Sequence, residues 1–246
     1  MDFTDFSLKK CFSNFMELTR GYSCLMIFAP LAVVFSYVYY SEYFSWFNFI
    51  ILALALCALQ MAANLFDDYI DIKNKLKKGI PLENINFDCF RAKARLILNK
   101  TFSIKKVEII LGILFGIGVL TGIYFILFAG LKLLIPIVLG GILILFYPVS
   151  SRYYSSEAVV GLIFGPLVML SASYALTKEI SFSLFLMSVA IAFSTVVLLH
   201  THNIMDFEFD IKNNKNTLCA LVKTKENMLK VLKAFVIVPY AVVVLG

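Results

Sequence analysis

The chain has 246 residues, of which 61% are hydrophobic and 15% charged, and its formal net charge is +6. A mean hydropathy of +0.87 excludes an ordinary soluble globular domain and indicates a protein that crosses a membrane several times. The cysteines have neither the spacing of a metal site nor that of a disulfide framework, so we expect reduced thiols.

The N-terminal segment, Met1 to Leu18, lacks the compact apolar core of a signal peptide. Its apolar residues recur at helical spacing, at Phe3, Phe6, Phe12, Phe15 and Leu18. Two lysines, Lys9 and Lys10, lie between them. This pattern predicts an amphipathic helix on a membrane surface, and a solvated leader is the alternative.

Apolar runs long enough to cross a bilayer recur along the rest of the chain. We predict six spans, at Tyr22–Tyr40, Phe44–Phe66, Val107–Ala129, Leu133–Val149, Val159–Leu176 and Phe182–His200. A seventh begins near Met228 and is interrupted at Gly246, so we expect the sequence to be a truncated version of a longer protein.

Charge predicts how these spans are oriented. Every lysine and arginine except Lys132 and Lys178 falls on one side of the predicted topology. Because cytoplasmic loops carry an excess of positive charge, we expect the N-terminus to face the cytoplasm, across a bacterial cytoplasmic membrane. The net charge is the sum of these loops and requires no nucleic-acid partner.

The second and sixth spans run into the same polar pattern. Its two copies are Asn64, Asp67, Asp71, Ile72, Lys73, Asn74 and Asn203, Asp206, Asp210, Ile211, Lys212, Asn213. At roughly 100° per residue, the amide and the two carboxylates of each copy fall within about 60° of one helix face. A solvated helix end is the alternative interpretation of either copy alone, but two opposed faces would suit Mg²⁺, which shares oxygen ligands with substrate phosphates.

A second echo accompanies these motifs. Ile27–Leu31 in the first span recurs as Ile163–Leu167 in the fifth, at nearly the same offset as the acidic motifs. An even number of spans separates the copies, so the repeats are predicted to be parallel. We therefore predict one domain over 1–246, with repeat one at about 20–149 and an incomplete repeat two at about 157–246.

A metal site built for a diphosphate also needs fixed cations, and arginine offers bidentate geometry. Arg91 and Arg95 lie four residues apart on a predicted helix from Asp88 to Asn99. The other candidate donors on this side are Arg20, Arg152 with Tyr153, Lys212 and Lys215. For most of the lysines the alternative role is to set topology and to contact anionic lipid.

These motifs resemble those of the UbiA-type intramembrane aromatic prenyltransferases, and most closely those of the 1,4-dihydroxy-2-naphthoate branch of menaquinone synthesis. The matching stretches are Asn64–Asp71, Phe164–Leu167, Asn203–Asp210 and Lys215–Leu218, and the resemblance runs from about Arg20 to the end. Glu157 matches the second position of a Gly-Glu dipeptide of that branch, whereas His202, Met205 and Asn214 depart from its pattern.

The resemblance implies an all-α polytopic membrane protein, with about nine transmembrane helices in parallel four-helix repeats around a cavity. It implies Mg²⁺ and a prenyl diphosphate, bound on the cytoplasmic side by Asn64, Asp68, Asp71, Asp206 and Asp210. The helical spacing adds Asp67 to the metal ligands, although that branch usually has Asn there, and Asn203 is assigned with Asn64 to the diphosphate.

The implied reaction moves a polyprenyl group from its diphosphate to an aromatic acceptor, most closely 1,4-dihydroxy-2-naphthoate, with 4-hydroxybenzoate as the alternative. Metal and basic side chains would stabilise the leaving diphosphate, and a dry, aromatic-lined pocket would protect the allylic cation from water. A parallel-repeat transporter would place its polar groups near the bilayer midplane instead. A CDP-alcohol phosphotransferase would need one compact Asp-rich stretch, which this sequence lacks.

Overall fold

The computed structural model describes residues 3–85, 94–212 and 215–245, and these form helices and turns without a strand. The α-helices are α1 Phe3–Leu18, α2 Leu25–Val38, α3 Trp46–Lys77, α4 Arg95–Leu98, α5 Ile104–Ala129, α6 Leu134–Ser150, α7 Ser156–Leu162, α8 Val168–Thr177, α9 Phe182–Met205, α10 Phe207–Lys212, α11 Leu218–Val222 and α12 Lys225–Leu245. Short 3₁₀ helices are η1 Gly21–Cys24, η2 Leu82–Asn84, η3 Leu131–Leu133 and η4 Ser151–Tyr153. The segment η5 Ile163–Leu167 is a π-helix.

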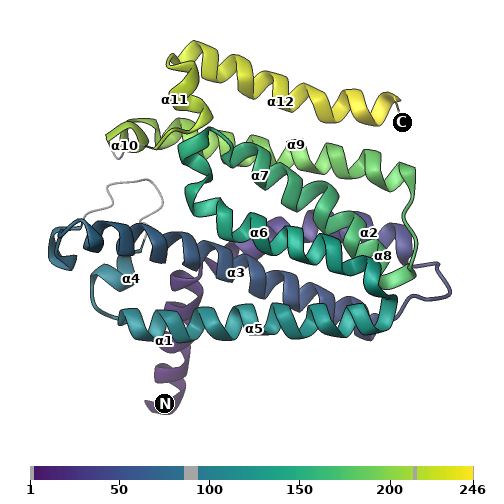
Figure 1. Ribbon diagram of the computed structural model, residues 1–246, viewed down its shortest axis with the longest axis horizontal. Coiled ribbons are helices and arrows are strands. Elements are labelled where there is room, and N and C mark those ends of the chain that lie inside the picture. The colour runs from purple at the N-terminus through teal and green to yellow at the C-terminus, as the bar shows by residue number, and fades with distance from the viewer. Residues whose placement is uncertain (1–2, 86–93, 213–214, 246) are drawn as a thin grey trace.

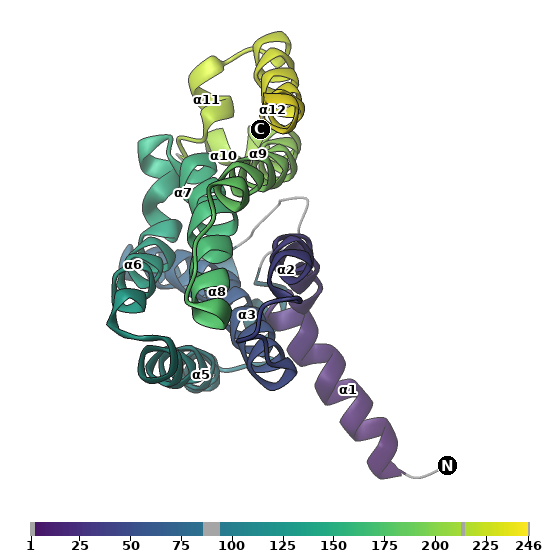
Figure 2. The same cartoon turned by 90° about the vertical axis from the view of Figure 1, so that its right-hand side faces the viewer.

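Within the described residues, seven helical segments are long and apolar enough to cross a membrane, which confirms the prediction of an all-α protein with seven spans in this sequence. Their bounds are Gly21–Val38, Trp46–Lys77, Ile104–Ala129, Leu131–Tyr153, Ser156–Thr177, Phe182–Met205 and Lys225–Val244. Figure 1 shows them running roughly side by side, with α3 and α5 packed together and α12 packed on α9. In Figure 2 the predicted N-terminal helix, α1, projects away from this bundle.

The helix that carries the first acidic motif is longer than a bilayer requires. α3 has 32 residues and is therefore about 48 Å long, against about 30 Å of hydrocarbon. It continues through the motif beyond the predicted end at Phe66, and stops where Gly79 adopts a left-handed φ of 76°. The amides of Gly79 and Ile80 bond back to the carbonyls of Leu76 and Lys75, the usual glycine-terminated helix end. The motif therefore lies on the projecting end of α3.

The second motif differs from the expectation of one unbroken helix. α9 ends at Met205, Asp206 lies at the junction, and α10 begins at Phe207. The backbone nevertheless keeps its helical spacing, because Asp206 N–H bonds to His202 and Asp210 N–H to Asp206, at 2.9 and 2.8 Å. The polar side chains of this motif consequently stay on one side of the chain.

The fifth span is kinked at the sequence echo. Pro166 removes a backbone donor there, and Gly165 has non-helical dihedrals of φ −88° and ψ −107°. A Cβ atom on Gly165 would lie 2.5 Å from both the Ala192 Cβ and the Ser188 carbonyl oxygen. Only glycine therefore allows η5 to approach α9 this closely, which places the buried Phe164 at the centre of the bundle.

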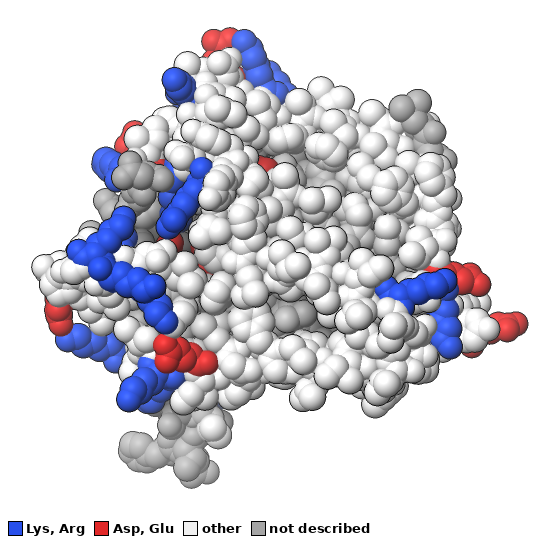
Figure 3. All heavy atoms as spheres, viewed as in Figure 1, with Lys and Arg blue, Asp and Glu red and all other residues white. Residues whose placement is uncertain are grey.

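Charged residues gather at the ends of the bundle. On the face seen in Figure 3, most basic side chains lie at the end where α4 and α10 are found, and a broad uncharged belt separates them from a smaller group. The opposite end includes Lys178, whose ammonium group lies over the rings of Tyr43 and Phe128. This distribution matches the asymmetry of lysine and arginine predicted from the loops.

Candidate functional site

An apolar cavity of about 680 Å³ runs along the inside of the bundle. On α3 its lining extends from Leu52 to Asn64, a distance of about 18 Å along the helix axis. Glycines from α5 and α6 form part of the wall, which widens the cavity because they carry no side chain; they are Gly118, Gly122, Gly140 and Gly141. The volume falls in the range of cavities that enclose small organic ligands.

A second, polar cavity of about 70 Å³ adjoins the apolar one, and both are lined by Arg20, Tyr147 and Leu199. The polar cavity is bordered by Asp67 of the first motif and by all three polar side chains of the second, Asn203, Asp206 and Asp210. The tertiary structure therefore brings residues of both motifs to the lining of one small cavity. In the second motif all three side chains are buried.

Arg20 lies at the junction of the two cavities and pairs with Asp68. The side chains of the pair are only 12% and 3% exposed. Burial lowers the pKa of the Arg20 guanidinium, but the nearby carboxylates of Asp68 and Asp67 outweigh burial and raise it above its usual value. Arg20 is consequently a permanent buried cation beside the first motif.

A direct contact also links the two halves of the site. The ammonium nitrogen of Lys215, which follows the second motif, lies 3.3 Å from a carboxylate oxygen of Asp71 in the first motif. Asn64 is directed elsewhere, since its amide nitrogen donates to the Ser23 hydroxyl at 2.6 Å and the residue lines the apolar cavity. The first motif thus spans the boundary between the apolar and polar cavities.

The donor set of the polar cavity fits a hard cation together with a phosphate. In the described chain no three Asp, Glu, His or Cys side chains lie close enough to hold a metal by themselves. Mg²⁺ does not require this, because it is usually bound by one or two carboxylates together with water and substrate phosphates. The carboxylates of Asp67, Asp206 and Asp210 line this cavity and would be the oxygen ligands from the two motifs.

Thr217 provides an independent sign of a missing polar ligand. It lines the polar cavity and is 4% exposed. Its hydroxyl has no hydrogen-bond partner, alone among the buried side-chain polar atoms of the described residues, although its position before α11 would allow a capping bond. An unpaired buried hydroxyl costs free energy unless a ligand satisfies it.

The structure separates several predicted donors from these cavities. The predicted continuous helix from Asp88 to Asn99 is wrong, because Ala94 has a φ of 60° and α4 begins only at Arg95. Arg95 is exposed and pairs with Glu17 at 2.9 Å. Exposed residues that line neither cavity are Arg152, Tyr153 and Lys212, and Arg91 lies outside the described residues.

Several residues that line the polar cavity were assigned no role from the sequence, and Tyr147 and Thr217 are the two with the clearest chemistry. Tyr147 lies near the end of α6 and borders both cavities, and Thr217 borders the polar one. Thr217 belongs to the Lys215–Leu218 stretch that carried the resemblance, so its position beside a candidate cation was the available signal. Tyr147 had no comparable signal among the many aromatic residues of the chain.

Comparison with known proteins agrees with this arrangement. No curated protein and no solved structure gives a match to the chain. The sequence profile of the UbiA prenyltransferase family, in contrast, matches residues 27–246. This range includes both acidic motifs and most of the residues that line the two cavities. With most of its length matched, the chain belongs to the UbiA prenyltransferase family.

Proposed function

We propose that the protein transfers a polyprenyl group from its diphosphate to 1,4-dihydroxy-2-naphthoate. One observation carries this proposal: a long apolar cavity adjoins a small polar cavity that carries carboxylates from both motifs, with Arg20 at the junction. A polyprenyl diphosphate has the same division, a long apolar chain joined to a compact, highly charged group. This match supports a placement of the substrate in which the prenyl chain occupies the apolar cavity and the diphosphate occupies the polar cavity.

The polar cavity would hold the diphosphate through fixed donors. Arg20 offers a guanidinium group at the point where chain and diphosphate meet, Lys215 an ammonium group, and Thr217 an unpaired hydroxyl. Asp67, Asp206 and Asp210 would hold Mg²⁺, which would neutralise charge on the leaving diphosphate. The ion pair of Lys215 with Asp71 would also fix the position of the second motif relative to the first.

The apolar cavity would protect the reacting carbon. The bond between the allylic carbon and the diphosphate oxygen breaks, and positive charge develops on the prenyl group. Aromatic faces near the polar end stabilise such a cation, and Tyr147, Phe115 and Phe164 line the cavity. The remaining lining is mostly aliphatic, which excludes water that would otherwise trap the cation.

The acceptor is proposed from the motif resemblance, and the residues that support it are Phe164–Leu167 and Asn203–Leu218. An electron-rich ring carbon attacks the allylic carbon, and a new carbon–carbon bond forms. With 1,4-dihydroxy-2-naphthoate, the ring then loses its carboxylate as CO₂. A naphthalene ring also buries more apolar area than a benzene ring in the same cavity.

We further propose that the polar cavity faces the cytoplasm of a bacterial cell. Arg20 and Lys215 line the polar cavity, and most basic side chains on the face in Figure 3 lie at one end of the bundle. Cytoplasmic loops carry the excess of positive charge. The site would then open to soluble Mg²⁺ and to the aromatic acceptor, while the prenyl chain enters from the bilayer.

The test is an assay in membranes from cells that express the protein, with one polyprenyl diphosphate. Three acceptors are supplied separately: 1,4-dihydroxy-2-naphthoate, 4-hydroxybenzoate and homogentisate. We expect prenylated, decarboxylated product from the first, and none from an Asp206→Asn control. Product from 4-hydroxybenzoate alone would reject the acceptor and leave prenyl transfer standing, whereas substrate flux into liposomes without covalent product would reject the enzyme in favour of a transporter.

A further inference from the structure

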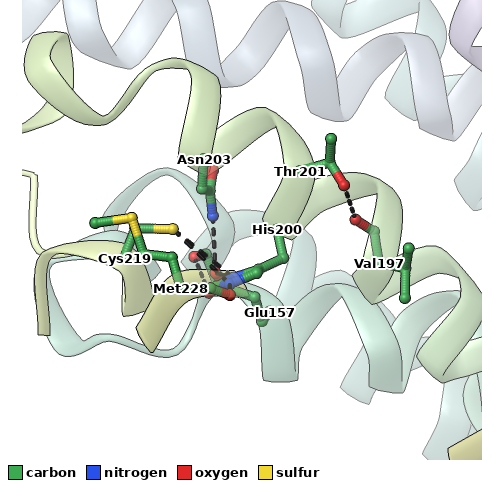
Figure 4. Close-up of polar contacts among 8 residues, drawn as sticks. Glu157, Val197, His200, Thr201, Asn203, Cys219 and Met228 are labelled. Atoms are coloured by element: carbon green, nitrogen blue, oxygen red, sulfur yellow. Dashed lines mark hydrogen bonds and ion pairs between the residues drawn. The ribbon is translucent and has the colours of Figure 1, made fainter. Parts of the chain in front are cut away.

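A buried polar cluster lies directly behind the second motif, outside both cavities except at its edge. Glu157 at the start of α7 accepts hydrogen bonds from the Asn203 amide nitrogen at 2.8 Å and from the Ser156 hydroxyl at 2.7 Å. Nδ1 of His200 lies 3.2 Å from the same oxygen of Glu157 that contacts Asn203. Figure 4 shows Glu157, His200 and Asn203 meeting between α7 and α9.

The cluster is closed on its far side. The other ring nitrogen of His200 lies 3.3 Å from the backbone carbonyl of Met228 in α12, and His200 itself is fully buried. The thiol sulfur of Cys219 also lies near the ring, 3.8 Å from Nδ1 and 4.0 Å from the other nitrogen. The ring of His200 lies against the Glu157 carboxylate on the side away from the polar cavity and holds that carboxylate in place.

This arrangement determines which way the Asn203 amide points. The amide atom that faces Glu157 is the NH₂ group, which donates to a carboxyl oxygen of that residue. The amide oxygen is therefore on the other side, as Figure 4 shows. Asn203 borders the polar cavity together with Asp206 and Asp210, so its oxygen is available there as a further acceptor.

We propose that Glu157, braced by Ser156 and His200, is a positioning residue that holds the Asn203 amide with its oxygen toward the polar cavity. The inference rests on the proposed function and deepens it, because it changes the role of Asn203. A diphosphate oxygen is an acceptor and gains nothing from an amide oxygen, whereas a hard cation binds one directly. Asn203 is thus a ligand of the cation rather than a donor to the diphosphate, and Glu157 selects between these roles.

Binding of Mn²⁺ to the detergent-purified protein in the presence of inorganic diphosphate, measured by electron paramagnetic resonance, tests this without turnover. Glu157→Met removes the acceptor and should weaken Mn²⁺ binding about 10- to 100-fold, the usual effect of losing a group that orients a ligand. Glu157→Gln keeps a carbonyl that can accept from Asn203 and should stay within a few fold of wild type. Thr195→Val alters a buried polar residue two turns earlier on α9 and serves as the matched control.

A donor–acceptor swap keeps the inference testable if Glu157→Met does not fold. Asn203→Asp places two carboxylates against each other and should weaken Mn²⁺ binding. In the double variant, Glu157→Gln with Asn203→Asp, the new amide NH₂ donates to the new carboxylate, and the second carboxylate oxygen still faces the cavity. We expect the double variant to recover affinity. Failure of that recovery, or equal losses in Glu157→Gln and Glu157→Met, would overturn the inference. Turnover by a wild-type protein that binds no Mn²⁺ would also overturn it while leaving prenyl transfer intact.

Discussion

The buried pair of Arg20 and Asp68 allows the stability of the site to be separated from its chemistry. Replacing Arg20 by Met leaves the Asp68 carboxylate, whose side chain is 3% exposed, without its arginine. Replacing Asp68 by Leu leaves the Arg20 guanidinium, whose side chain is 12% exposed, without its paired carboxylate. The weaker attraction of the Asp67 carboxylate then offsets only part of the cost of burying it. We expect each single change to destabilise the folded protein, and the double change to destabilise it much less, because neither charge is then left buried.

The magnitude follows from the burial of both groups. Removing one partner of a buried ion pair costs about 3–5 kcal/mol, whereas replacing both by apolar residues of similar size is often close to neutral. The coupling between the two substitutions should therefore be large and easily resolved. All three variants should be inactive in prenyl transfer, because the cation at the junction of the two cavities is lost or misplaced in each.

Unfolding in mixed micelles, followed against the mole fraction of SDS, measures the stabilities. Lys230→Met, which breaks an exposed pair with Glu226, is the control and should leave the transition nearly unchanged. Additive destabilisation in the double variant would refute the reasoning, since it would mean that the two charges do not depend on each other. An active double variant would remove Arg20 from the binding site.

Three further predictions concern the polar cavity and its surroundings. EDTA should abolish turnover and Mg²⁺ should restore it, and full activity in EDTA would contradict this. Asp206→Asn should lower kcat by at least about 100-fold, because one ligand change can disable a shared metal site. Thr217→Val should lower kcat/KM for the diphosphate about tenfold, the value of one hydrogen bond to a charged group, while Thr217→Ser stays near wild type; equal effects would place the hydroxyl outside the site. Burial, with Glu157 and Asp210 adding to it, raises the pKa of Cys219 to about 12, so this thiol stays protonated at pH 8. Maleimide should label the exposed Cys11 far faster than Cys219 in the folded protein, and comparable rates would show that the cluster behind α9 is open.

Local patterns predicted all the spans, with ends that are a few residues off except in α3, which runs from Trp46 to Lys77 although its predicted end is Phe66. Hydrophobic length alone located all seven helical segments, and the same pattern placed the acidic motifs where those segments end. The errors are instructive. α3 extends through its motif because the motif residues form helix until Gly79, whereas α9 breaks at Asp206. Neither outcome follows from hydropathy, because hydropathy indicates whether a segment lies in lipid or water and does not indicate where its backbone hydrogen bonding ends.

The candidate site was only partly predictable. The motif residues repeat in the sequence, so the repeat alone was enough to assign Asp67, Asp206 and Asp210 to one site. The cations could not be ranked in the same way, because a basic residue near a membrane surface has many possible partners. Arg20 is buried against the first motif, whereas Arg95 pairs with Glu17 at the surface.

The sequence by itself determined the membrane class, the helical spans and the two acidic motifs, because these depend on residues close together in the chain. Only the tertiary structure decided which groups meet. Arg20 and Asp68 are 48 residues apart, and Glu157 and Asn203 are 46 apart. Their contacts arise from the packing of helices whose surfaces are almost uniformly apolar, so no local pattern marks them. Burial then makes these few polar contacts specific, since a polar group without a partner inside the bundle is costly.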